Sequence, residues 1–216
     1  IPVHIVSGTG TNGSRQRARR AGAVAFLEKP VAPEALHAAF EEMASFIDRR
    51  VRSLLVVEDD DRERETIVEL VGGRDVSVTA VASSEEALAA LDEQRFDCMV
   101  LDLKLPKTTG FDLLEKVKAD ERFVDLPIIV YTGKELTRRE ETKLKRYAET
   151  IIVKDASSPE RLLDETSLFL HRVESRLPKA KRRMLEQLHS TEAIFQGKKI
   201  LVVDDDVRNV FALASA

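Results

Sequence analysis

The stretch that decides the fold is MVLDLKLPKTTGFDLL, residues 99–114. It starts with a short apolar run, places Asp102 where that run ends, and continues through a loop into the helical pattern of Leu113, Leu114 and Val117. A continuous apolar run of this kind is typical of a strand that is buried on both faces of a parallel sheet. The stretch therefore predicts a strand, a loop and a helix, with a carboxylate at the carboxyl end of the strand.

The same pattern recurs on both sides of this stretch. The apolar runs are Leu54–Val57, Val76–Val81, Cys98–Leu101, Ile128–Tyr131 and Ile151–Val153, and helical patterns alternate with them. Such alternation indicates right-handed βαβ units around a parallel sheet. We expect an α/β fold, a doubly wound five-stranded parallel sheet, within about 120 residues.

Composition narrows the class of protein. The chain is 43% hydrophobic and 33% charged, with a net charge of -4, which is typical of a globular protein with an apolar core. The mild acidity argues against a nucleic-acid binder, and no apolar run approaches the ~18 residues of a membrane span. There is no secretory leader pattern, and the single cysteine, Cys98, suits a reducing compartment, so we expect a cytoplasmic location.

The chain also repeats itself, which sets its domain organisation. The stretch SLLVVEDDDRERETI at 53–67 matches KILVVDDDVRNVFAL at 199–213, and LPIIVYTG at 126–133 matches IPVHIVSG at 1–8. In the same way, AETIIVKDASSPERLLDE at 148–165 matches AGAVAFLEKPVAPEALHA at 21–38. We expect the C-terminal half of one domain at 1–51, a complete domain at 52–175, a helical linker at 176–197 and the start of a third domain at 198–216. Since the chain starts without Met and stops within a helical pattern, we expect it to be part of a longer protein.

Apolar residues recur every seven positions at Leu163, Leu170, Leu177 and Met184. This spacing fits either a coiled-coil seam or a last helix that packs on its own domain and is followed by a polar linker. The second reading is favoured, because Pro178 would interrupt a continuous seam. The basic run 179–183 is expected to be a solvated helix face.

Polar residues follow four of the five predicted strands. They are Glu58 and Asp59, Asp102, Thr132, and Lys154. In a parallel sheet these positions gather at one edge, where function is usually found. Crowded carboxylates need a counter-charge, which Mg2+ supplies beside a phosphate. A carboxylate can also attack phosphorus, and a lysine and a hydroxyl can then neutralise the transferred group.

In its motifs LLVVEDD, MVLDLKLPKTTGFDLL, PIIVYTG and IIVK, the middle domain resembles the receiver domain of bacterial response regulators across about 120 residues. The resemblance implies a flavodoxin-like fold in which Asp102 is the phosphoacceptor. It also implies that Glu58, Asp59, Asp102 and the backbone carbonyl of Lys104 bind Mg2+, or Mn2+ in its place. Thr132 would sense the phosphoryl group and Lys154 would pair with it. The loop residues Leu105, Pro106 and Gly110 match the family's loop after the acceptor.

The partial domains keep counterparts of these residues. They are Ser7 and Lys29 in the first, and Asp204 and Asp205 in the third. Tandem receivers of this kind resemble the C-terminal part of hybrid sensor histidine kinases. The implied partners are a histidine kinase or a histidine phosphotransfer domain, in cis or in trans, and the neighbouring receivers.

Three positions depart from the family pattern. Asp155 stands where the family has Pro, so the cis peptide bond of the family is in doubt, since such a bond is costly without Pro. Ile151 stands where an aromatic residue usually reports the switch, and Glu58 replaces an Asp. Asp60 and Asp61 are expected to start a helix rather than bind metal.

Other function classes stay open at this point. One is a receiver-like scaffold that takes no phosphate and serves as a binding module, which Asp155 and Ile151 favour. Another is a small phosphatase or other α/β enzyme, although no further acid or nucleophile follows a strand. The sequence carries no kinase core, and its four histidines lie in no phosphoacceptor-histidine motif.

Overall fold

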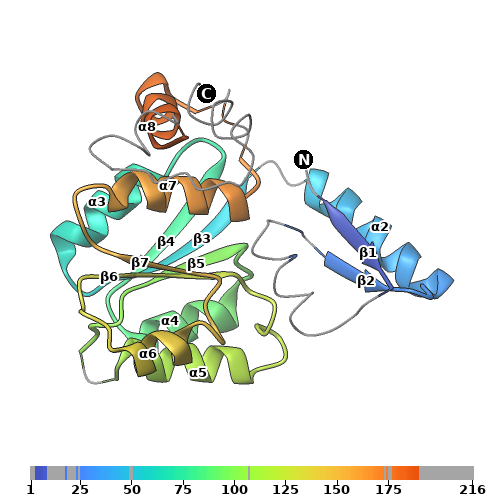
Figure 1. Cartoon of the computed structure of the whole chain (residues 1–216), viewed down its shortest axis with the longest axis horizontal. Coiled ribbons are helices and arrows are strands. Elements are labelled where there is room, and N and C mark those ends of the chain that lie inside the picture. Colours follow the sequence, from blue (N-terminus) through green and yellow to red (C-terminus); the bar gives the residue numbers. More distant parts are fainter. Residues whose placement is uncertain are drawn as a thin grey trace, which may run out of the picture.

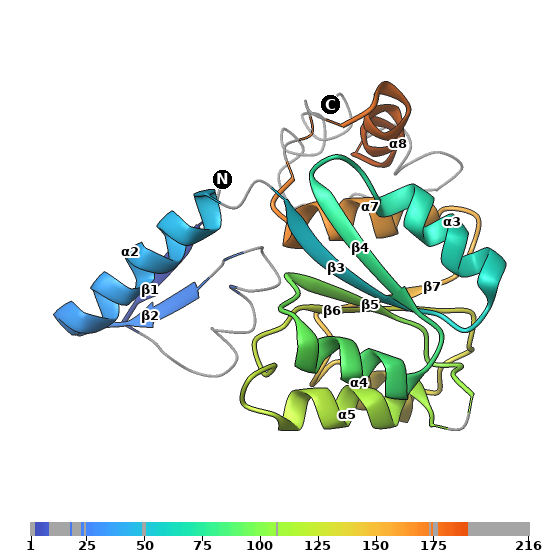
Figure 2. The ribbon, with the colours of Figure 1, turned by 180° about the vertical axis from the view of Figure 1, so that it is seen from behind.

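The computed structural model describes residues 3–8, 18, 23, 25–48, 51–106, 108–172, 174 and 177–189. The main body is a five-stranded parallel sheet with helices on both faces (Figures 1 and 2). Its strands are β3 (Arg52–Val57), β4 (Val76–Val81), β5 (Cys98–Leu101), β6 (Ile128–Thr132) and β7 (Thr150–Val153). Its helices are α3 (Asp61–Val71), α4 (Ser84–Glu93), α5 (Gly110–Ala119), α6 (Arg138–Leu144), α7 (Ser158–Phe169) and α8 (Lys179–His189).

The strand order is β4-β3-β5-β6-β7. The chain leaves β3 for β4 on one side and then crosses back to β5 on the other, so the order reverses between β3 and β5. Crossovers of this kind leave a crevice at the carboxyl ends of the two strands. The predicted doubly wound, flavodoxin-like sheet is thereby confirmed.

The two faces of the sheet have separate cores, which explains the continuous apolar runs. Leu55 and Val57 point into a core shared with α4, α5 and Leu144 of α6. Leu54 and Val56 point to the opposite face, where α3 and α7 cover them. Alternate residues of one strand thus enter opposite cores, as the pleat of a strand requires.

Helix α8 packs back on the main body, above α7 in Figure 1. Leu163, Leu177 and Leu185 form a buried cluster, and Leu70 of α3 and Met184 pack against it. Leu163, Leu177 and Met184 of the seven-residue spacing therefore contact their own domain, as the packing interpretation expects. Residues 179–189, however, form a docked helix and not the polar linker that this interpretation placed after the last helix. The expectation of a solvated face at 179–183 is wrong for Lys181, whose Nζ donates to the carbonyl oxygens of Glu69 and Gly72, both at 2.8 Å.

The N-terminal part forms a smaller unit of β1 (His4–Ser7), β2 (Ala25–Glu28) and α2 (Pro33–Asp48). Its two strands are parallel and paired from His4↔Ala25 to Ser7↔Glu28. This arrangement agrees with the last two strands and last helix of a domain like the middle one, but the tandem organisation stays a prediction. The expected third unit at 198–216 lies outside the described residues.

Among the described residues, the one cis peptide bond is Lys29–Pro30, so the bond after Lys154 is trans. None of the helices among the described residues is both long and apolar enough to cross a bilayer.

Candidate functional site

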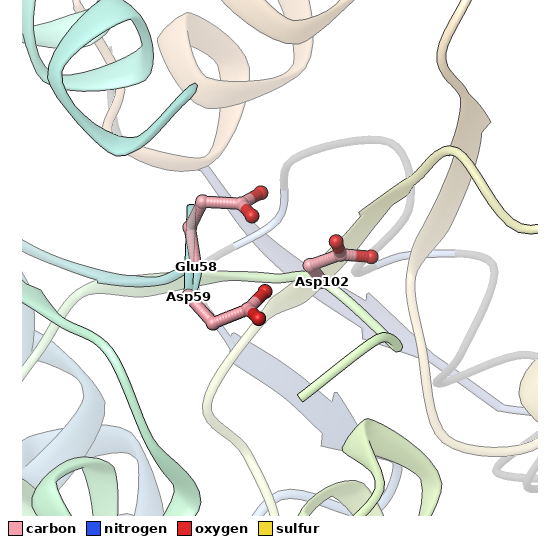
Figure 3. Close-up of side chains that lie close together, drawn as sticks. All are labelled: Glu58, Asp59 and Asp102. Carbon is pink, nitrogen blue, oxygen red and sulfur yellow. The ribbon is translucent and has the colours of Figure 1, made fainter. Parts of the chain in front are cut away.

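The carboxyl ends of β3 and β5 bring together Glu58, Asp59 and Asp102. One carboxylate oxygen from each lies within 4.8 Å of the others (Figure 3). The sheet hydrogen bonds extend to the first and the last of these residues: Glu58 N donates to Val81 O at 3.1 Å, and Asp102 N donates to Val57 O at 2.9 Å. The hydrogen bonds of the sheet therefore fix the backbone positions from which the Glu58 and Asp102 side chains project. Glu58 and Asp102 are buried, at 2% and 5% exposure, while Asp59 is exposed.

Lys154 follows β7 and brings a positive charge to this cluster. Its Nζ lies 2.9 Å from Glu58 Oε2 and 3.5 Å from Asp102 Oδ2. It also contacts the carboxylate of Glu63, and lies 5.2 Å from the centre of the Tyr131 ring. The Lys154 ammonium thus supplies part of the counter-charge that the carboxylates need.

Burial acts on the ionisation of both partners of the buried ion pair. It raises the pKa of the Glu58 carboxyl, and the hydrogen bond from Lys154 offsets only part of that effect. For Lys154, burial disfavours the charged form, but the hydrogen bonds to Glu63 and Glu58 and the charge of Asp102 outweigh it, so its pKa lies above the ordinary value. Lys154 is therefore a firmly charged cation at the edge of the cluster.

The loop after Asp102 holds its side chain. Asp102 Oδ1 accepts from Leu103 N at 2.6 Å and from Lys104 N at 3.3 Å. Gly110 starts α5 against this loop, and its N donates to Leu103 O at 3.1 Å. A Cβ at Gly110 would lie 2.4 Å from Asp102 O and 2.7 Å from Leu103 Cα, so only glycine fits this approach.

Thr132 ends β6 and is fully buried. Its Oγ1 accepts from Lys134 N at 3.2 Å, which ties the hydroxyl to the loop before α6. Its carbonyl oxygen accepts from Lys154 N at 2.9 Å, so the two residues are neighbours through the backbone. The structure thus brings Glu58, Asp59, Asp102 and Lys154 into one cluster, with Thr132 at its border; their roles, and that of the Lys104 carbonyl, remain predictions.

The smaller unit repeats this backbone relation. Ser7 and Lys29 correspond to Thr132 and Lys154, and Lys29 N donates to Ser7 O at 2.8 Å. Asp204 and Asp205, the expected counterparts of Glu58 and Asp59 in the third unit, lie outside the described residues.

Two departures from the family pattern have local roles in the structure. Asp155 Oδ1 accepts from Ser157 N at 2.9 Å, and its carbonyl oxygen accepts from Ser158 Oγ at 2.9 Å, so Asp155 shapes the turn into α7. Ile151 is half-buried beside α6. Asp60 is the N-cap of α3 and accepts from Arg62 N and Glu63 N, which confirms that it starts a helix.

Two further residues at this site, Glu63 and Tyr131, were not predicted from the sequence. Glu63 is the third residue of α3, where an acid after an N-cap Asp is usually read as helix capping. Tyr131 belongs to an apolar run and is usually read as core. Only the strand order shows that both lie beside Lys154, since Glu63 is 91 residues away along the chain.

The donor set fits a hard divalent cation. Carboxylate oxygens are the ligands that Mg2+ and Mn2+ accept, and exposed Asp59 leaves an approach from solvent. A parallel sheet with such a cluster at its switch point, beside a lysine and a threonine, is the arrangement that the class of receiver domains has.

Comparisons with known proteins agree with this class. The family model of the response regulator receiver domain matches residues 54–167, and the chain belongs to this family. A two-component response regulator of Arabidopsis thaliana, ARR9, is 27% identical over 177 residues, which are 72% of this chain and 73% of that protein. The chemotaxis protein CheY of Pseudomonas aeruginosa is 37% identical over 83 residues, 37% of this chain and 65% of that protein.

Solved structures show the same fold. The chemotaxis response regulator CheY4 of Vibrio cholerae has a TM-score of 0.50 at 26% identity. The superposition covers 55% of this chain and 98% of the CheY4 chain. The Mn2+-bound form of the response regulator Rcp1 has a TM-score of 0.51 at 21% identity and covers 59% of this chain and 99% of its own.

Proposed function

We propose that residues 52–175 form a phosphoacceptor module in which Asp102 takes a phosphoryl group from a phosphohistidine, in a reaction that depends on Mg2+. The observation that carries this proposal is the cluster of Glu58, Asp59 and Asp102, within 4.8 Å of one another, with Lys154 beside it. Two of these carboxylates, Glu58 and Asp102, are buried, where apolar residues would serve the fold at least as well, because buried like charges destabilise it.

Each residue has a defined task in this reaction. The Asp102 carboxylate attacks phosphorus, a bond forms between its oxygen and phosphorus, and the histidine nitrogen leaves with the electron pair. Lys154 pairs with the new phosphoryl oxygens, and the Thr132 hydroxyl donates to one of them. Mg2+, or Mn2+, held by Glu58, Asp59, Asp102 and the Lys104 carbonyl, supplies the positive charge that offsets the phosphoryl oxygens.

The wider setting follows from the internal repeats. We place the module between the C-terminal half of a first receiver, at 1–51, and the start of a third, at 198–216, in a multi-receiver protein of the hybrid sensor histidine kinase kind. Its partners are then a histidine kinase or a histidine phosphotransfer domain, in cis or in trans, and the neighbouring receivers. The cytoplasm is the compartment that supplies such partners. Mn2+ is a candidate for the site because the response regulator Rcp1, which has the same fold, has a Mn2+-bound form.

A second candidate function is a receiver-like scaffold that binds partners without phosphorylation. The specific observations behind it are Asp155 and Ile151, which replace residues of the family's switch. They do not touch the carboxylate cluster, however, so the phosphoacceptor function is favoured.

Labelling with acetyl phosphate and Mg2+ distinguishes the phosphoacceptor function from the scaffold function. We expect one hydroxylamine-sensitive phosphoryl group on the protein, found by intact mass, and none on Asp102→Asn. Asp92→Asn, which removes an exposed carboxylate of α4, serves as the matched control and should label like the wild type. Labelling that persists in Asp102→Asn would assign the acceptor elsewhere, and no labelling of the wild type would favour the scaffold.

A further inference from the structure

Lys154 is held by more carboxylates than its proposed task requires. Its Nζ donates to Glu58 at 2.9 Å and to Glu63, while Asp102 lies 3.5 Å away as an ion pair. An ammonium has three N–H donors, and two of them are therefore already directed at Glu58 and Glu63. The contact with Glu63 needs an explanation, because Glu63 is not part of the proposed metal and acceptor set.

The backbone of Glu63 is fixed, while its side chain is half-exposed. Asp60 caps α3 by accepting from Glu63 N at 2.9 Å, which sets the direction in which the first turn projects its side chains. The Glu63 side chain is 51% exposed, whereas that of Glu58 is 2% exposed. Glu63 can therefore turn into solvent at low cost, and Glu58 cannot.

A phosphoryl group on Asp102 would compete for the same ammonium. Glu58 loses its need for Lys154 once a cation lies beside it, because the cation then supplies the counter-charge. Glu63 gains no such replacement, so it is the carboxylate that still competes with the phosphoryl oxygens for the charge of Lys154.

We propose that Glu63 is a positioning residue that holds Lys154 in the unphosphorylated domain and competes with the phosphoryl group for its ammonium. This inference rests on the proposed phosphoacceptor function. It adds a residue that affects the equilibrium between the unphosphorylated and the phosphorylated state of Asp102. Removing the Glu63 charge frees Lys154 for the phosphoryl group, which raises affinity for a phosphoryl mimic. The freed ammonium also pairs more strongly with Glu58 and competes with the cation for it, which lowers affinity for Mg2+ alone.

The test is Glu63→Gln against Glu65→Gln. Glu65 lies on the same helix, is exposed, and has no contact with Lys154 among the described contacts, so the pair separates the ion pair from the change in net charge. The chain has no Trp, so amide shifts in NMR spectra are the suitable readout of binding. Mg2+ is titrated alone, and beryllofluoride is then titrated at saturating Mg2+.

For Glu63→Gln we expect beryllofluoride affinity to rise by about fivefold, which converts to ~1 kcal/mol, the upper range for a half-exposed ion pair. Mg2+ affinity should fall by about twofold to threefold. Glu65→Gln should match the wild type in both titrations. Glu63→Asp keeps the charge but has a shorter side chain, so its affinities should lie between those of the wild type and those of Glu63→Gln.

The Nζ resonance of Lys154 in the metal-free protein gives a second readout. It should shift in Glu63→Gln and stay in place in Glu65→Gln. Equal beryllofluoride affinities in Glu63→Gln and the wild type would overturn the inference. A fall in both affinities would also overturn it, since that is the result of a merely structural role. If the wild-type protein binds no beryllofluoride, the proposed function is overturned. The proposed competition between Glu63 and the phosphoryl group for Lys154 is then overturned as well.

Discussion

His171 follows the C-cap residue of α7, Leu170, and lies in the left-handed backbone region with a φ of 49°. His171 N donates to Leu168 O at 3.0 Å and Arg172 N donates to Ser167 O at 2.8 Å, the two bonds of a Schellman motif. Arg172 is thereby directed back to Asp75, which it binds through two hydrogen bonds of 3.0 and 2.9 Å. One unusual residue conformation thus ties the end of α7 to the turn before β4.

The first prediction concerns the ionisation of His171. Burial lowers the pKa of His171 to about 4 from its ordinary value of 6.5. The unfolded chain then binds a proton below pH ~6.5 that the folded chain binds only below about 4, so stability is full above pH 6.5 and falls as the pH drops through this window. We expect the loss to reach about 1–2 kcal/mol, after allowance for the partial exposure of the ring.

His171→Asn isolates this effect, because Asn tolerates the left-handed region and does not titrate. We measure the free energy of unfolding by urea denaturation. The value for the wild type minus that for the variant should decrease as the pH is lowered from 7 to 4.5. A difference that stays constant with pH would show that His171 does not titrate in this way.

The second prediction concerns Gly110. Ala at this position brings a Cβ to 2.4 Å from Asp102 O and must displace the acceptor loop. We expect Gly110→Ala to lower the rate of labelling by acetyl phosphate by at least about tenfold and to destabilise the domain by about 1–3 kcal/mol. Gly133→Ala is the control: its Cβ would lie 3.8 Å from Lys154 Cδ, an ordinary contact. Equal labelling rates for Gly110→Ala and the wild type would contradict the proposed role of this loop.

At the scale of elements, α8 behaves as a sixth helix of the receiver body. Leu185 is 1% exposed in the cluster with Leu163 and Leu177, and Lys181 caps the carbonyl end of α3. Cations at a helix C-terminus are favourable, and here the cation comes from another helix. The same face therefore joins α3, α7 and α8.

The third prediction tests this docking. Leu185→Ala should lower the free energy of unfolding by about 2–3 kcal/mol, near the lower end for buried leucines, because α8 can undock before the body unfolds. Arg183→Ala, on an exposed position of the same helix, should change it by less than about 0.5 kcal/mol. Amide exchange in 179–189 should rise in Leu185→Ala alone. Exchange as fast in the wild type as in this variant would mean that α8 does not dock in solution.

The elements also show which features the sequence could predict. The buried runs predicted all five strands, because strands covered on both faces carry an unbroken apolar signal. The ends were harder: β3 starts at Arg52, where Arg52 N donates to Asp75 O without any apolar signal. The contacts of Lys181 with α3 and of Glu63 with Lys154 lay beyond prediction, since they join charged residues that only the tertiary fold brings together.

At the scale of the whole molecule, the question is how a charge on Asp102 would reach other parts of the chain. The Thr132 hydroxyl is bonded to Lys134 N, at the start of the segment that leads to α6. Lys134 in turn pairs with Glu140 at 2.7 Å, and lies 4.9 Å from the centre of the Phe111 ring. A hollow of about 580 Å³ lies between α6 and β7, with Leu136 and Ile151 in its lining, so the segment has space to move.

The last prediction is that 133–150 shifts between two states when a phosphoryl mimic binds. Turning the Thr132 hydroxyl toward the phosphoryl group breaks its bond to Lys134 N and releases the loop. Ile151 is β-branched and has little rotamer freedom, so the loop and α6 must absorb the movement. Hydrogen exchange with and without beryllofluoride, at saturating Mg2+, should therefore change in 133–150.

Two variants locate the origin of that change. Thr132→Ala should still bind beryllofluoride but show a much smaller difference in 133–150, because the loop amide no longer depends on the hydroxyl. Thr142→Ala, which removes an exposed hydroxyl bonded to Arg138 O on α6, should behave like the wild type. A shift of ~1–2 kcal/mol between the two states would change the affinity of a neighbouring receiver or other partner by about 5- to 30-fold. If exchange in 133–150 is identical with the mimic bound and absent, the domain stores phosphoryl groups or serves as a scaffold, and does not transmit their presence through α6.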